Sequence, residues 1–166
     1  MIYSILLIAT YTKLGEDRKA FNYYKQAHEM IRNLYNDSDD INVAQSLSNL
    51  GVAYELIFEE KKAIDYKLQG LEMKKRLLLP DQYSQDIIDS LNSICLTFIR
   101  LGEYKKALEY KLQALEANKK ILKNDTNVLS DCLTDIANLY ERMGDEKKAS
   151  EFNKEAIKLN YSLDKI

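Results

Sequence analysis

Histidine and cysteine, residue types often used as catalytic bases, nucleophiles and zinc ligands, are few and far apart in this sequence. The 166-residue chain has one histidine, His28, and two cysteines, Cys95 and Cys132, with no Cys-x-x-Cys motif. Nucleophilic catalysis needs a cysteine or serine beside a base, and a zinc site needs closely spaced Cys and His ligands. Paired acids such as Asp39 and Asp40 lie in a polar connection, which is typical of helix caps. We therefore predict no enzyme, no catalytic residues and no metal or cofactor site.

Charge and hydropathy argue against several kinds of partner. Lys and Arg number 24 and Asp and Glu number 26, so the net charge of -2 lacks the basic surplus that nucleic acid binding requires. The N-terminal MIYSILLIATYTK is apolar for about ten residues, shorter than the ~18 of a membrane span, and it lacks the basic start of a signal peptide. Two cysteines without a disulfide pattern fit a reducing compartment. We expect a cytoplasmic protein that binds neither nucleic acid nor membrane.

One sequence pattern occurs four times along the chain. Its clearest part is LGEDRKA at 14–20, FEEKKA at 58–63, LGEYKKA at 101–107 and MGDEKKA at 143–149. An aromatic residue stands nine positions before the closing alanine, and a small residue stands seven positions after it. The four alanines recur every 42 to 44 residues, as Ala20, Ala63, Ala107 and Ala149. Self-similarity at a fixed period indicates a repeat architecture.

Each repeat must contain two helices that hold these positions in place. The apolar residues recur at i, i+3, i+4 and i+7, which in the third repeat are Leu91, Ile94, Cys95 and Phe98. We expect a first helix at 1–14, 40–57, 84–101 and 128–143, and a second helix at 17–35, 60–79, 104–123 and 146–162. One such pair cannot bury its apolar face alone, so neighbouring pairs should stack.

This pattern resembles the tetratricopeptide repeat, and the long period resembles its kinesin-light-chain-like subgroup. The resemblance is clearest in INVAQSLSNLGVAYE (41–55), SLNSICLTFIRLGEYKKALEYKLQALE (90–116) and SDCLTDIANLYERMGDEKKA (130–149). It implies an all-α fold, a right-handed α-α superhelix of four helix-turn-helix repeats. These would form a single array over residues 1–166, with repeats at about 1–38, 39–82, 83–125 and 126–166.

Some residues depart from the repeat pattern. Phe58 replaces the glycine expected in the turn of the second repeat. Lys67 and Lys111 occupy the position of Tyr24 in the first repeat. We expect both lysines to lay their stems along the packing surface and to keep their ammonium groups in water.

The resemblance also implies that the first helices line a concave groove for a peptide or protein segment. Asparagine side chains suit this role because an amide both donates and accepts hydrogen bonds. Acids outnumber the bases on this face, so a clamp for an anionic C-terminus is not expected. An ordinary solvated helix face is the alternative. The candidate residues are Gln45, Asn49, Val52, Asp89, Asn92, Leu96, Arg100, Asp131, Asp135, Asn138 and Arg142.

The first function hypothesis is therefore an interaction module or scaffold that holds another protein. Alternatives are a sensor fragment of a larger signalling protein, such as a switch ATPase or caspase-like protease, and a peptide-responsive regulator. The N-terminal repeat carries Ile2, Ile5 and Leu6 where later repeats carry polar residues at several equivalent places. A helix that is apolar nearly all round is normally buried against another surface, so we predict self-association through this repeat.

Overall fold

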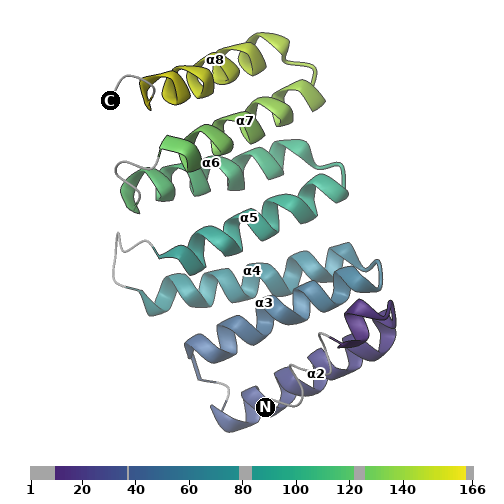
Figure 1. Ribbon diagram of the computed structural model, residues 1–166. Helices are drawn as coiled ribbons and strands as arrows, with labels where there is room; N and C mark the ends of the chain where they lie inside the picture. Colours follow the sequence, from purple (N-terminus) through teal and green to yellow (C-terminus); the bar gives the residue numbers. More distant parts are fainter. Residues whose placement is uncertain (1–9, 37, 79–83, 122–125, 164–166) are drawn as a thin grey trace. The chain divides into compact units, whose positions relative to one another are not determined.

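The computed structural model describes residues 10–36, 38–78, 84–121 and 126–163, and every regular element in these ranges is an α-helix (Figure 1). The chain divides into two compact units, Met1–Gln82 and Tyr83–Ile166. Each unit contains two of the expected repeats. None of the helices in the described part of the chain is long and apolar enough to cross a membrane.

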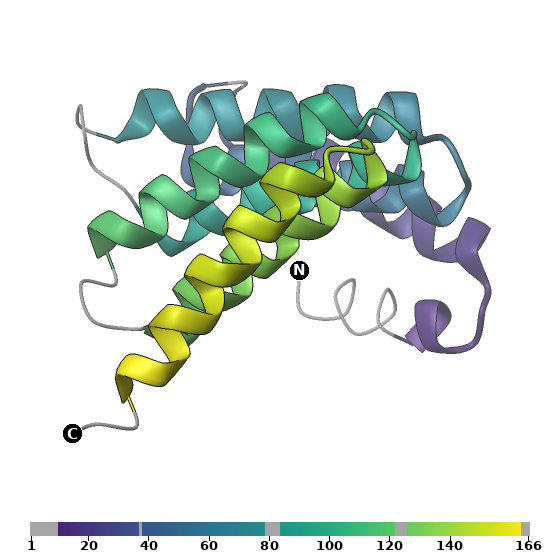
Figure 2. The same cartoon turned by 90° about the horizontal axis from the view of Figure 1, so that it is seen from above.

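The first unit contains α2 (Asp17–Leu34), α3 (Ile41–Leu56) and α4 (Glu60–Leu77), which follow helical residues at 10–13. The second unit contains α5 (Gln85–Arg100), α6 (Tyr104–Ile121), α7 (Thr126–Arg142) and α8 (Glu146–Leu163). In Figures 1 and 2, α7 and α8 lie side by side and run in opposite directions, as expected for one repeat. The seven helices agree with the predicted ranges to within two residues at each end. Most of the helix predicted at 1–14 lies outside the described residues.

Local side-chain bonds explain where several helices begin. The Asp40 carboxylate accepts a hydrogen bond from the backbone N–H of Asn42 at 2.7 Å, at the start of α3. Ser84 serves α5 in the same way, through the N–H of Ile87. Such caps satisfy donors that have no partner within the helix, each worth about 1 kcal/mol.

The turns between paired helices share one geometry. In the fourth repeat, the N–H of Asp145 donates to the carbonyl of Tyr140 at 2.9 Å, and Gly144 adopts a positive φ of 78°. Phe58 adopts the same left-handed conformation, with φ of 60°. The N–H of Glu59 bonds to the carbonyl of Tyr54 at 3.0 Å, so the phenylalanine preserves the turn despite its side chain. This is the helix-ending motif in which glycine is normally preferred.

Packing inside each repeat uses the residues that define the pattern. The repeat alanines Ala63 and Ala107 have no exposed surface, and the two aromatic positions stack on each other, as in Tyr140–Phe152 with ring centroids 5.4 Å apart. In the first unit, α3 and α4 lie close together at Gly51 and Gly70. A Cβ on Gly51 would lie only 2.9 Å from the carbonyl oxygen of the repeat alanine in α4.

In the second unit, a core forms from α6, α7 and α8. Leu115, Leu133 and Ile136 are buried there together with Cys132 and Ala156. The side chains that pack around them are Leu108, Val128, Leu129, Tyr140, Phe152 and Leu159. This cluster fixes α7 between its neighbours and leaves its other face for contact with solvent or a ligand.

Candidate peptide-binding surface

In the first unit, the predicted site residues lie on one stripe of α3. Gln45 and Asn49 are exposed and Val52 is half-buried. The amide of Gln45 donates to the Oδ1 atom of Asn49 at 3.1 Å. The Nζ atom of Lys74, from α4, donates to Oε1 of Gln45 at 3.0 Å, although Lys74 itself is only 3% exposed. A lysine of the second helix therefore reaches the surface of the first.

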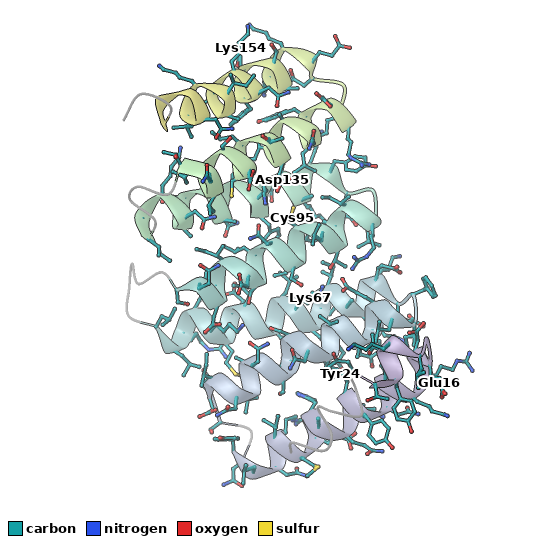
Figure 3. All side chains as sticks on the ribbon, in the orientation of Figure 1. Glu16, Tyr24, Lys67, Cys95, Asp135 and Lys154 are labelled. Atoms are coloured by element: carbon teal, nitrogen blue, oxygen red, sulfur yellow. The ribbon has the colours of Figure 1, made fainter. Side chains whose placement is uncertain are left out.

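Lys67 makes a second such contact and corrects the expectation that its ammonium group lies in water. It is 3% exposed, and its Nζ lies 2.6 Å from Oε1 of Glu55 on α3 (Figure 3). The stem crosses Gly51, where a Cβ would lie 2.6 Å from Cγ of Lys67. Because no side chain at position 51 blocks the path, the lysine passes between the helices. Burial lowers the pKa of Lys67 to about 8, although the nearby carboxylate favours the charged form.

Lys111 connects two helices of the second unit. Its Nζ donates to Oδ1 of Asn92 on α5 at 3.1 Å and lies 2.7 Å from Oδ2 of Asp135 on α7. Lys111 is 8% exposed, so the expectation that its ammonium group lies in water is also wrong. The side chain of Asp135, which is labelled in Figure 3, is 57% exposed. The structure thus joins two predicted site residues through a buried cation.

The other candidates form two parallel sets on α5 and α7. Residues at i, i+3 or i+4, i+7 and i+11 share a helix face, and both sets follow this spacing. Leu96 is 57% exposed, a large apolar side chain among polar ones. The guanidinium of Arg142 lies 5.7 Å from the centre of the Tyr104 ring. The exposed candidates of this unit are Asp89, Leu96, Arg100, Asp131, Asp135, Asn138 and Arg142.

The lysines of the second helices were missed as site residues in the sequence. A search of first-helix positions finds few bases, because Lys67, Lys74 and Lys111 belong to the partner helix of each pair. Their regular position was the available signal, since Lys67 and Lys111 stand at the same place in two repeats. The candidates of α3 belong to a different unit from those of α5 and α7, so one groove through all three helices stays a prediction.

The two cysteines are buried and not poised for chemistry. Cys95 is 3% exposed and Cys132 is 4% exposed. Burial raises the pKa of both thiols, which keeps them protonated at neutral pH. The amide of Asn118 donates to the sulfur of Cys132 at 3.3 Å. Among the described residues, no group of three or more His, Cys, Asp or Glu side chains is arranged to hold a metal ion.

Comparison with known proteins gives a consistent result for the fold. BtubC (BKLC) from P. vanneervenii is 20% identical with a TM-score of 0.80, over 97% of this chain and 63% of that one. Kinesin light chain TPR-like repeats of Podosopora anserina are 16% identical with a TM-score of 0.81, over 96% of this chain and 74% of the other. MamA is 21% identical with a TM-score of 0.63, over 98% and 80% of the two chains. The chain thus spans 63% of the length of BtubC. No curated protein matches the sequence.

These neighbours confirm the predicted fold class, an all-α superhelix of the tetratricopeptide type, and the likeness to kinesin light chain repeats. A model of the tetratricopeptide repeat matches residues 1–76 and 86–162. Such repeats are generally scaffolds for protein–protein interaction and are typically not enzymes. The chain therefore belongs to the tetratricopeptide repeat family.

Proposed function

We propose that this protein is a scaffold that binds an extended peptide or protein segment on the outward faces of its first helices. The observation that carries the proposal is the bridge from Lys111 to Asn92 and Asp135. It holds side chains of α5 and α7 in fixed positions on a shared surface. Preorganised side chains lower the cost of binding because less freedom is lost when a ligand arrives.

The side chains of this surface suit a segment that carries both apolar and charged groups. Leu96 lies one helical turn beyond Asn92 and offers an apolar contact, while Asn138 offers an amide to a peptide backbone. Both helices carry acids earlier along their length and an arginine at the end, Arg100 in α5 and Arg142 in α7. A ligand that carries a basic side chain at one end and an acidic one at the other would match this order.

Peptide display against the whole chain tests the proposal. Peptides that bind should lose affinity at least tenfold against Leu96→Asp and against Arg100→Glu, because these changes remove the apolar contact or invert the charge at the surface. Lys105→Glu is the matched control, since Lys105 is exposed near the start of α6. Equal loss with Lys105→Glu, or none with the two surface variants, would place the binding elsewhere.

We also propose that the four repeats form one continuous array, which would extend this surface to Gln45 and Asn49 of α3. The near-equal spacing of the repeat alanines supports it. The two free, buried cysteines support a reducing compartment such as the cytoplasm. Paramagnetic labels on α3 and α7 would show one sharp distance distribution for a continuous array, and a broad one for two loosely joined units.

A further inference from the structure

An open groove of about 870 Å³ lies in the first unit, between the turn that precedes α2 and the turn that joins α3 to α4. Glu16, labelled in Figure 3, belongs to the first of these turns. Phe21 of α2 lines one side of the groove, Leu56 and Phe58 line the other, and most of the lining is apolar. None of the residues of the candidate peptide-binding surface lines it, so the groove is a separate feature of the molecule.

Phe58 lines this groove although neither the turn nor the packing of the chain favours a phenylalanine there. Its φ of 60° is the left-handed conformation, which glycine adopts readily and which is disfavoured for a residue with a Cβ. The ring is 83% exposed, so burial of the ring does not offset that cost. Strained residues cluster at functional sites, and aromatic side chains are frequent anchors of protein interfaces. The presence of Phe58 at this place therefore indicates an interaction surface.

The equivalent place in the second unit is bridged by the protein's own side chains. Counting from the repeat alanines, Tyr104 and Arg142 stand where the first unit has Asp17 and Leu56. The guanidinium of Arg142 lies 5.7 Å from the centre of the Tyr104 ring, and a glycine stands in place of the exposed phenylalanine. An aspartate and a leucine cannot make this contact between a cation and a ring. The first unit therefore has an open groove where the second unit has an internal contact.

The charged side chains that line the groove are compensated, with one exception. Lys19 forms an ion pair with Glu16, and the carboxylate of Glu59 lies 3.4 Å from the ammonium group of a lysine in the first turn of α4. Asp17 is the first residue of α2, where the helix dipole favours a carboxylate. Arg18 is exposed, and its side chain makes no ion pair with another described residue. The groove therefore offers one cation for an acidic group of a ligand.

We propose that this groove binds a segment of a partner protein that presents a large apolar side chain next to a carboxylate. The apolar side chain would lie against Phe21, Leu56 and Phe58, and the carboxylate would meet Arg18. Asn22 is exposed one turn further along α2, and its amide would bond to the backbone of the segment. Small-molecule sites enclose most of their ligand, whereas this groove is open to solvent, so its shape suits a side chain carried by a protein.

The test is a titration of the whole, isotopically labelled chain with an acetylated and amidated peptide of sequence alanine-leucine-phenylalanine-glutamate-alanine, followed by amide chemical shifts. We expect saturable shifts at residues 15–22 and 56–60. Affinity should be at least fivefold higher than for the same peptide with lysine in place of glutamate. Arg18→Gln should weaken binding of the glutamate peptide at least fivefold, whereas Lys105→Gln, at the equivalent position of the second unit, should leave it unchanged.

Three variants separate a role of the Phe58 ring in binding from a role in folding. Phe58→Gly relieves the left-handed strain and should still lower affinity at least fivefold, and Phe58→Ser, which keeps a Cβ but no ring, should do the same. Phe58→Tyr keeps the ring and should retain binding. The proposal is overturned by absence of saturable shifts, by equal binding of the lysine peptide, by undiminished binding in Phe58→Gly or Phe58→Ser, or by shifts centred on residues 89–100 and 131–142, which would place the peptide on the candidate peptide-binding surface instead.

Discussion

Phe58 is the residue whose replacement should most directly stabilise the fold. It adopts a φ of 60° and its surface is 83% exposed, while glycine occupies this turn position in the other three repeats. A left-handed conformation costs a residue with a Cβ about 1–2 kcal/mol. Phe58→Gly removes that cost, and little packing is lost because the ring is in solvent.

The gain is reduced by the greater freedom of glycine in the unfolded chain, about 0.4–1 kcal/mol. The net expectation for Phe58→Gly is an increase in unfolding free energy of about 0.5–1 kcal/mol. The reverse change, Gly102→Ala, should lower stability by a similar amount. Gly102 has φ of 73° and an added Cβ would meet nothing within 4 Å, so only the backbone term acts there.

Urea unfolding followed by far-UV circular dichroism measures both changes, and the slope of free energy against urea should stay constant. Lys61→Gly is the control, because Lys61 is an exposed residue of α4 in ordinary helical conformation. It should destabilise by about 0.5–1 kcal/mol. If Phe58→Gly destabilises as Lys61→Gly does, the left-handed strain at position 58 is not a significant cost and the reasoning fails.

Three further predictions concern packing, protonation and association. Gly51→Ala should cost about 1–3 kcal/mol in urea unfolding, because its Cβ would meet Lys67 at 2.6 Å and backbone at 2.9 Å; an unchanged midpoint would contradict this close approach. Because the pKa of Lys67 is lowered from 10.5 to about 8, the unfolded state binds more protons between these values, so stability should rise with pH there. Lys67→Met should remove that part of the pH dependence, and an identical profile would show that the lysine is not desolvated. Sedimentation at micromolar concentration should show self-association of the wild-type protein. Polar substitutions at Ile2, Ile5 and Leu6, which lie outside the described residues, should abolish this self-association. A monomeric wild-type protein would refute the prediction.

The helices and turns were predictable because their determinants are local. The spacing of apolar residues predicts α5 and α7. Gly102 predicts the turn between α5 and α6 from the same short stretch of sequence. The ammonium positions of Lys67 and Lys111 were not predictable in this way. A lysine on a half-buried face can extend to solvent or inward, and the choice depends on acceptors elsewhere. For Lys111 those acceptors are on α5 and α7, so the answer needs the packed arrangement of three helices.

Positions at which one repeat differs from the others are informative, because the repeats pack two helices together with the same pattern of residues. Where they agree, as at Ala107, the residue is explained by close contact between helices. Where one repeat departs in a buried place, as at His28, the side chain has a local partner of its own, the Ser46 hydroxyl 2.9 Å from its Nδ1 atom, while leucine stands at the equivalent position of the third repeat.

The same argument separates the acids of the candidate peptide-binding surface. Asp135 neutralises the buried Lys111, so a basic group of a ligand would have to share that carboxylate with a cation that cannot return to water. Asp131 is exposed one turn earlier on α7, whereas the ion pair of Lys111 is made with Asp135. Asp135 should therefore act mainly by positioning Lys111 and Asn92. Asp131 should make the direct contact with a basic side chain of the bound segment, so its replacement by asparagine should weaken binding without a change in stability.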